Sequence, residues 1–246
     1  PINVDLWLEE GNLIDLGNAS FTDVTLLQTP VLGGHVNQTG VVQVTDGASF
    51  TILGSGHTTE LNNQIVAGNI DIIDSAVVRD GETVTLTSQA GSININFDLD
   101  GTAGGADETL ILDAANDVVI KGAIGSVAQL STLHITGATN IRFEGSVNVK
   151  HLILDEGATF TVDGTLSAED VQLNGVSSAT FHSGVTLSTS LTTTGSTLVN
   201  AVFEGQVIAP SISITAQQLV DFYQLVDATN AIAVTTGNRS PYLPDT

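Results

Sequence analysis

A phrase of about 20 residues returns along the second half of the chain, and this period restricts the possible folds more than any other feature. Each copy opens with two residues, almost always apolar, that lie two positions apart. These pairs are Leu110/Leu112, Leu133/Ile135, Leu152/Leu154, Val171/Leu173, Leu191/Thr193, Ile212/Ile214 and Ile232/Val234. Successive pairs begin 19 to 23 residues apart over six intervals, which an irregular strand-rich sequence would not maintain. The repetition predicts one structural unit stacked on copies of itself.

Each copy then contains two more short apolar segments. The second segments are VVIKG (118–122), IRFEG (141–145), FTVDG (160–164), TFHSG (180–184) and AVFEG (201–205), and the third are SVNV (146–149), TLS (165–167), VTL (185–187) and QVI (206–208). The Gly that closes every second segment is expected at a sharp bend, often with positive φ. Three short strands and three corners in about 20 residues predict an all-β fold, a parallel β-helix (β-solenoid).

Alternation within the strands predicts which side chains line the interior. In residues 132–136 we expect Leu133 and Ile135 to point inward and the residues between and beside them to point outward. Because stacked turns lie about 4.8 Å apart, equivalent positions should form columns along the axis. One predicted interior column consists of Phe143, Val162, Phe181 and Phe203.

The sequence divides into three predicted regions. Residues 1–100 form a less regular, strand-rich N-terminal or capping region, residues 101–236 form the regular solenoid, and residues 237–246 form a C-terminal tail with two prolines. In the first region, the strand-like stretches at 40–56 and 69–74 suggest turns about 28 residues apart, with longer loops than in the second half.

Three segments depart from the repeat. Residues 82–101 read as two alternating strands joined by a Gly-containing turn, which predicts a hairpin. Residues 2–13 alternate as an edge or capping strand would, and in a polymer this strand could add to a neighbouring sheet. Residues 216–228 carry apolar side chains at helical spacing, so that a short helix and a distorted turn of the solenoid remain open there.

Composition and charge narrow the range of partners. The chain is 41% hydrophobic but only 4% aromatic, and its apolar residues are mostly Val, Ile, Leu and Ala, which favour strands. It has 27 acidic and 5 basic residues, for a formal net charge of −22. Such a charge repels nucleic-acid phosphates and anionic lipid surfaces, so we expect neither as a partner. Diffuse acidity also keeps a repetitive β protein soluble.

The absence of Cys, of Met and of long apolar runs further limits what the chain can be. The chain has no Cys, and therefore neither a disulfide framework nor a thiol site. No apolar run approaches the roughly 18 residues needed to cross a bilayer, so we expect no membrane insertion. Since the chain starts at Pro1 and has no Met, we expect a processed product or an excerpt of a longer protein.

The best candidate for a metal site lies in FDLDGTAGGADET (97–109). Asp98 and Asp100 precede a Gly, and Asp107 and Glu108 follow the loop. Calcium takes six to eight hard oxygen ligands, and a D-x-D-G turn supplies carboxylates and carbonyls on one side. The spacing does not match an EF-hand loop. Calcium bound by these four residues is therefore one hypothesis, and a solvated turn before the regular solenoid is the other.

Catalytic chemistry has little support in the sequence. His134, His151 and His182 lie in different copies of the repeat and form no metal-binding pattern, so we expect tolerated polar surface residues. Glu144, Asp163 and Glu204 come just before the Gly that closes the second segment of their copies, and they would form a row of carboxylates rather than an acid/base pair. No nucleophile-elbow, P-loop or dinucleotide-binding motif occurs. We therefore predict that the chain is not an enzyme and has no organic cofactor.

The stretch GGADETLILDAANDVVIKGAIGSVAQLSTLHITGATNIRFEGSVNVKHLILD (104–155) resembles β-strand-repeat regions of large exported bacterial surface proteins, the filamentous-haemagglutinin-like adhesins and related fibrous proteins. The resemblance covers roughly residues 104–235 and transfers no catalytic residues. It implies a parallel β-helix outside the cell or on the bacterial surface that serves adhesion, surface coating or filament formation.

Three hypotheses about function follow. The first is a non-enzymatic structural segment of an adhesin, surface layer or filament that self-associates into a fibre or layer and contacts cell-surface glycan. The second is a carbohydrate-active β-helix enzyme, a polysaccharide lyase or hydrolase. The third is a calcium- or glycan-binding module.

Overall fold

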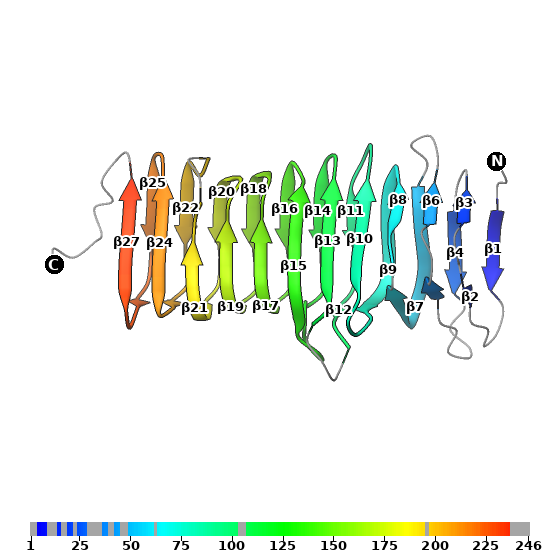
Figure 1. Cartoon of the computed structure of the whole chain (residues 1–246), viewed down its shortest axis with the longest axis horizontal. Coiled ribbons are helices and arrows are strands. Elements are labelled where there is room, and N and C mark those ends of the chain that lie inside the picture. The colour runs from blue at the N-terminus through cyan, green and yellow to red at the C-terminus, as the bar shows by residue number, and fades with distance from the viewer. Residues whose placement is uncertain are drawn as a thin grey trace.

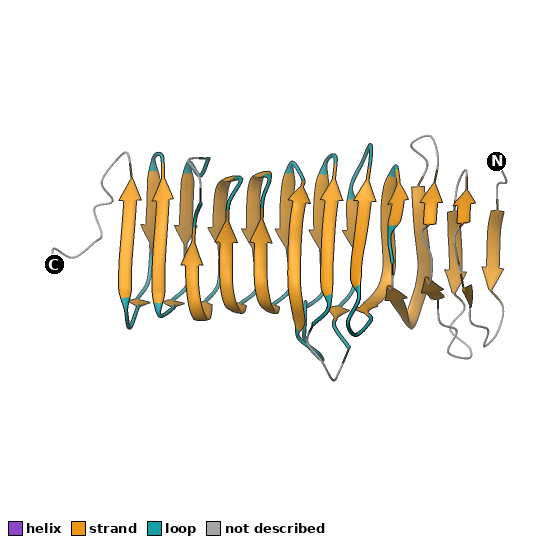
Figure 2. Ribbon diagram, in the orientation of Figure 1, coloured by secondary structure: helices purple, strands orange, loops and turns teal. Residues whose placement is uncertain are grey.

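The computed structural model describes residues 4–8, 14–15, 19–21, 24–28, 36–38, 42–44, 49–61, 63–102, 107–194 and 197–236, with side chains from residue 59 onward except residue 74. The predicted tail 237–246 lies outside these residues. All of the regular structure in the described ranges is β-strand, and short loops connect the strands (Figure 2). In the same ranges, no helix is long and apolar enough to cross a membrane.

The strands form three parallel ladders that run side by side along the long axis (Figure 1). The phenylalanine ladder, named for the rings that line it, contains β1 (Val4–Leu8), β4 (Val24–Gln28), β7 (Ser49–Leu61), β9 (Asn69–Val78), β11 (Ile93–Ile95), β14 (Asp117–Ile120), β16 (Asn140–Phe143), β18 (Gly157–Val162), β20 (Val176–Phe181), β22 (Asn200–Phe203) and β25 (Leu219–Phe222). The leucine ladder contains β3 (Ala19–Phe21), β6 (Val42–Val44), β8 (Ile65–Ala67), β10 (Thr83–Ser88), β13 (Thr109–Ala114), β15 (Leu130–Gly137), β17 (Val147–Leu154), β19 (Leu166–Leu173), β21 (Val185–Thr192), β24 (Ser211–Ala216) and β27 (Ala231–Thr236). Each turn passes once through every ladder, which confirms the all-β parallel β-solenoid predicted from the repeat.

The short ladder joins the other two at one corner. Its separate strands are β2 (Ile14–Asp15), β5 (Val36–Gln38), β12 (Leu99–Asp100), β23 (Val207–Ile208) and β26 (Val226–Asp227). Elsewhere the short ladder is formed by the ends of longer strands and by one isolated bridge at Ile124. The residues that pair in succession along it are Thr59, Ala76, Leu99, Ile124, Val147, Leu166, Val185 and Val207. The third segment of the sequence repeat is therefore real, but in β17, β19 and β21 it merges with the strand of the leucine ladder that follows it.

The register reproduces the predicted columns. Leu133 pairs with Leu110 on one side and Leu152 on the other, and Phe143, Val162, Phe181 and Phe203 follow one another in the phenylalanine ladder. Leu133 and Ile135 are fully buried, whereas His134 between them is partly exposed. The core is thus a continuous stack of Val, Ile, Leu and Phe side chains in which each turn buries the apolar face of the next.

In one turn, the aromatic ring of the core lies in the column next to the phenylalanine column. The alternation of apolar residues in the sequence does not reveal this displacement. Where the phenylalanine column carries Val162, the same strand β18 carries Phe160 in the adjacent inward position. The Phe160 ring packs edge-to-face on Phe143 and Phe181, with centroids 5.5 and 5.6 Å apart. Beyond it, Phe181, Phe203 and Phe222 stack in parallel at 4.8 Å, the spacing of the turns. Every turn from β16 to β25 therefore contributes one Phe ring to this stack.

Two predictions about local structure were wrong, and one open alternative is now decided. The hairpin over residues 82–101 was wrong, because β10 and β11 belong to different ladders and each pairs in parallel with strands of neighbouring turns. The interval of 28 residues was also wrong: Val24 pairs with Phe50, Phe50 with Ile70 and Ile70 with Ile93, so that these turns take 20 to 26 residues. Of the two readings of residues 216–228, the turn of the solenoid is correct, since β25 and β26 continue their ladders.

The expectation of a strand at the first edge is confirmed in the backbone. β1 is the terminal strand of the phenylalanine ladder and pairs in parallel with β4. The ladders continue without a break past residue 100, since β9 pairs with β11 and β11 with β14. The less regular first region thus differs from the second in the length of its turns.

The repeated Gly residues have a different role from the predicted one. Among the described residues, positive φ occurs only at Gly81 and Gly125, neither of which closes a second segment. A Cβ on Gly145 would lie 2.3 Å from the carbonyl oxygen of Gly122, and a Cβ on Gly164 would lie 2.5 Å from the carbonyl of Gly145. At Gly122, Gly145, Gly164 and Gly205, a Cβ would lie within 2.5 Å of backbone atoms of the preceding turn, and this close approach favours Gly at these positions.

Candidate functional site

The residues of the calcium hypothesis lie near one another in the chain but serve different contacts. Asp98 Oδ1 accepts a hydrogen bond from the Ala123 amide at 2.8 Å, and Asp100 Oδ1 accepts one from the Val127 amide at 2.9 Å. Both carboxylates therefore tie the wide loop of the next turn, residues 121–129, to their own turn.

The other two carboxylates differ in exposure, since Asp107 is exposed and Glu108 is buried. Asp107 Oδ1 accepts a hydrogen bond from the Gly81 amide at 3.1 Å, and the pKa of Asp80 is raised by loss of hydration and then by the Asp107 carboxylate. Glu108 is fully buried: its Oε1 accepts a hydrogen bond from the Thr102 amide at 2.7 Å, while its Oε2 has no hydrogen-bond partner among the described residues. In the part of the chain that the structure describes, no three acidic or His side chains are grouped to hold a metal ion. Calcium binding here stays a prediction, to be tested by the melting temperature of the protein with and without calcium.

The histidines of the repeat are more closely tied than the sequence indicated. His134 Nε2 bonds Asp155 Oδ2 at 2.6 Å, His151 Nδ1 bonds Asp170 Oδ2 at 2.5 Å, and His182 Nδ1 bonds Glu204 Oε2 at 2.8 Å. In every case the carboxylate belongs to the following turn. The signal was present as a separation of 19 to 22 residues between each His and its acid, which equals one turn of the repeat.

A charged row crosses the outer side of the phenylalanine ladder. Arg142 donates to Asp163 through Nε and Nη2 at 3.0 and 2.8 Å, and its Nε lies 3.8 Å from Glu144. His182 lies between Asp163 and Glu204, 3.7 and 2.8 Å away. The predicted row of carboxylates thus exists, but Arg142 and His182 are interleaved with it. This arrangement links successive turns and does not present two free carboxylates to a substrate.

A second polar row crosses the outer corner at the end of the leucine ladder. Asn174 donates to Asp155 Oδ1 at 2.9 Å, and Thr194 Oγ1 bonds Asn174 Oδ1. The hydrogen bond from Asn174 lowers the pKa of Asp155, burial opposes this shift, and His134 adds to the lowering. Together with His134 these residues connect four consecutive turns through their side chains.

Replacing Asp155 by Asn should remove part of the acid sensitivity of folding. Because the pKa of Asp155 is lowered below 3.8, the folded state favours the ionised carboxylate, and the resulting stability is present above about pH 4 and lost as the pH falls through the lowered pKa. Since the side chain is 42% exposed, we expect solvent screening to limit the effect to below about 1 kcal/mol. Urea denaturation at several values between about pH 2 and pH 6 measures it.

Asp113→Asn is the matched control, because the Asp113 carboxylate makes no hydrogen bond or ion pair with the described residues. The control should keep the acid dependence of the parent protein. An unchanged acid profile in Asp155→Asn would contradict the linkage.

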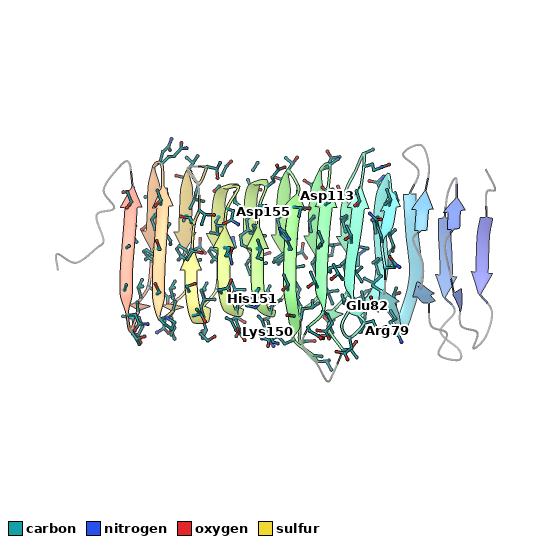
Figure 3. All side chains as sticks on the ribbon, in the orientation of Figure 1. Arg79, Glu82, Asp113, Lys150, His151 and Asp155 are labelled. Carbon is teal, nitrogen blue, oxygen red and sulfur yellow. The ribbon has the colours of Figure 1, made fainter. Side chains whose placement is uncertain are left out.

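A shallow groove of about 520 Å³ lies at the same outer corner, next to this row. It extends over four turns, from Thr87 and Ser88 past Asp113 and Ala114 to Gly137 and Glu156. Asp113 and Asp155 lie toward the same end of the strands, whereas His151 and Lys150 lie toward the other (Figure 3). No pattern in the sequence indicates this groove.

The groove follows from small side chains at one position of successive turns. Ala67 pairs with Ser88, and Ser88 pairs with Ala114. In the next turn the register shifts between Leu112 and Asp113, so that Asp113 lies opposite Gly137. A Cβ on Gly137 would lie 2.4 Å from Asp113 Oδ1, which shows that the carboxylate lies over the Gly.

Comparisons with protein-family models, curated proteins and solved structures give no match to this chain.

Proposed function

We propose that the chain is a structural segment of a non-enzymatic extracellular protein, such as an adhesin, a surface layer or a filament on a bacterial surface. The observation that carries this proposal is the unbroken stack of three parallel ladders, in which the backbone of every described turn bonds to the next. A stack of this kind transmits load and keeps its direction over any number of turns, because each turn meets only its neighbours.

The outward side chains support the same role. The two polar rows, Arg142–Asp163–His182–Glu204 and His134–Asp155–Asn174–Thr194, bond across turns rather than around a common centre. Individually exposed pairs of this kind add little free energy, but a row adds a contact at every turn. The carboxylates of Asp155, Asp163 and Glu204 are engaged between turns in these rows, which favours a structural role for this part of the surface.

A cleavage assay separates these two classes. The protein should leave acidic and neutral polysaccharides intact over prolonged incubation, as followed by the size of the products and the release of reducing ends. Turnover that is lost in Asp163→Asn or Glu204→Gln would overturn the structural proposal, because both substitutions spare the buried core. Stretching single molecules should meanwhile show turns that detach in succession, as neighbour-only contacts require.

Self-association into a fibre or layer belongs to the same proposal. Parallel ladders end in strands with unpaired backbone groups, and such edges can accept a strand from another copy. Electron microscopy of the concentrated protein should show rods or sheets longer than one chain. Monodisperse single particles at every concentration would remove self-association from the proposal and leave the single-chain structural role standing.

A further inference from the structure

The groove at the outer corner is shallow and open to solvent. Its volume is about 520 Å³, and its lining is mostly polar. It spans four turns, and three spacings of about 4.8 Å make it roughly 14 Å long and parallel to the axis. An occupant should therefore be extended, narrow and a few units long.

The backbone around the groove does not offer a place for a peptide strand. The amide of Gln89 bonds the Ala67 carbonyl, that of Ala115 bonds Ser88, and that of Thr139 bonds Asn116. Strand addition requires unpaired amides and carbonyls, and these are already used between turns. Recognition must come from the side chains of the rim.

These side chains are hydroxyls, an amide and carboxylates. Asp113 and Glu156 are the charged residues of the lining, and both are acidic. Asp113 carries a carboxylate without a protein partner among the described residues, and Glu156 is exposed. Anionic ligands such as uronates are repelled, whereas a ligand with amino groups and hydroxyls meets complementary charge and hydrogen-bond partners.

We propose that this groove binds a short oligosaccharide that carries free amino groups, with about one sugar ring for each turn. Extended β-linked sugar chains repeat at a spacing close to that of the turns, so that successive rings would meet equivalent positions of the solenoid. An ammonium group near Asp113 and another near Glu156 would account for the two carboxylates. The inference goes beyond the structural role, which does not require any ligand.

The test is a titration of ¹⁵N-labelled protein with the tetramer of β-1,4-linked glucosamine at moderate salt, followed by NMR. Amide signals of residues 113–115 and 137–139 should shift, with smaller changes elsewhere. Asp113→Asn and Glu156→Gln should each weaken binding about tenfold, the usual consequence of losing a charge-assisted hydrogen bond. Ala115→Leu, which adds bulk at an exposed position of the lining, should weaken binding without lowering the melting temperature.

Four comparisons make the result specific. Glu169→Gln removes an exposed carboxylate from β19, outside the groove, and should bind like the parent protein. The N-acetylated tetramer and oligogalacturonate should bind much more weakly, because one lacks the cations and the other is anionic. Tetralysine tests general attraction to a chain of charge −22.

Equal binding of tetralysine, equal loss of affinity in Glu169→Gln, or no shifts at the groove would each overturn the proposal. The cleavage assay and the pulling experiment do not depend on this titration, so that failure here leaves the structural role unaffected.

Discussion

Gly164→Ala is expected to lower the melting temperature by about 6–12 °C. A Cβ at this position would lie 2.5 Å from the carbonyl carbon and oxygen of Gly145 and 2.6 Å from the Ser146 amide nitrogen. These are backbone atoms of the adjacent turn, which can move away only if the ladder hydrogen bonds on both sides lengthen. Overpacking of this kind costs about 3 kcal/mol, and each kcal/mol shifts the melting temperature of a chain of this size by about 2–4 °C.

Gly184→Ala is the matched control. Gly184 closes the equivalent sequence segment, but the nearest atom to a Cβ placed there is the Gln206 carbonyl oxygen at 3.7 Å, an ordinary contact. The position that faces Gly205 in this turn is Ser183, one residue earlier. We expect Gly184→Ala to be neutral or to stabilise the fold by up to about 1 kcal/mol through the unfolded state. Equal destabilisation by both substitutions, measured by circular dichroism on heating, would refute the account of close approach.

Removing the Phe160 ring should destabilise the fold by about 3–5 kcal/mol, the usual cost of a buried Phe→Ala replacement. The ring is 1% exposed and contacts Phe143 and Phe181, so that Phe160→Ala leaves a cavity between two aromatic neighbours. Urea denaturation followed by circular dichroism gives the change in free energy, with an early loss of cooperativity expected where the stack is interrupted.

Exchange of the two residues of β18 tests whether the ring or its column matters. In the double variant Phe160→Val and Val162→Phe, the new ring would enter the column between Phe143 and Phe181 and stack at the 4.8 Å observed for Phe181 and Phe203. The exchange should recover part of the stability lost in Phe160→Val alone. Recovery should remain incomplete, because the valine introduced at position 160 would face the small Ala179. A double variant less stable than either single variant would show that the edge-to-face packing itself is required.

The Gly and Phe positions show which features of the core a sequence pattern can predict and which it cannot. The recurrence of Gly at the end of each second segment was visible, but its reason was misassigned, because a positive φ and a close approach of two backbones select the same residue. Gly184 was grouped with the others, and only the register separates it from the crowded column. Similarly, alternation placed Val162 correctly in the phenylalanine column but could not show that Phe160 fills the space beside it.

The contacts of the candidate site could be predicted from the sequence even less well than the Gly and Phe positions, because they depend on packing between turns. The acidic partners of His134, His151 and His182 lie one turn away. The separation of about one repeat is visible in the sequence, but the sequence does not show which side chains form a hydrogen bond. The acidic residues around 98–108 looked like one cluster because they are close in sequence. Asp107 accepts a hydrogen bond from Gly81 and the buried Glu108 accepts one from Thr102, while Asp98 and Asp100 are used by backbone amides of the next turn.

The hairpin prediction for residues 82–101 failed for a related reason. Two alternating strands joined by a short turn are compatible both with an antiparallel hairpin and with two successive sides of a solenoid. Which of the two forms depends on the backbone groups that the neighbouring turns offer for pairing. β10 pairs with β13 and β8 because the leucine ladder already presents strands on both sides.

From the sequence alone, the parallel stack, its period and its interior columns followed, because each turn repeats the same alternation and any other register would expose the apolar residues. Folding in three dimensions determined the contacts between turns: the crowded Gly column, the displaced Phe160, the polar rows and the corner groove. These features depend on distances between residues about 20 positions apart, to within fractions of an ångström, and a local pattern carries no information on that scale.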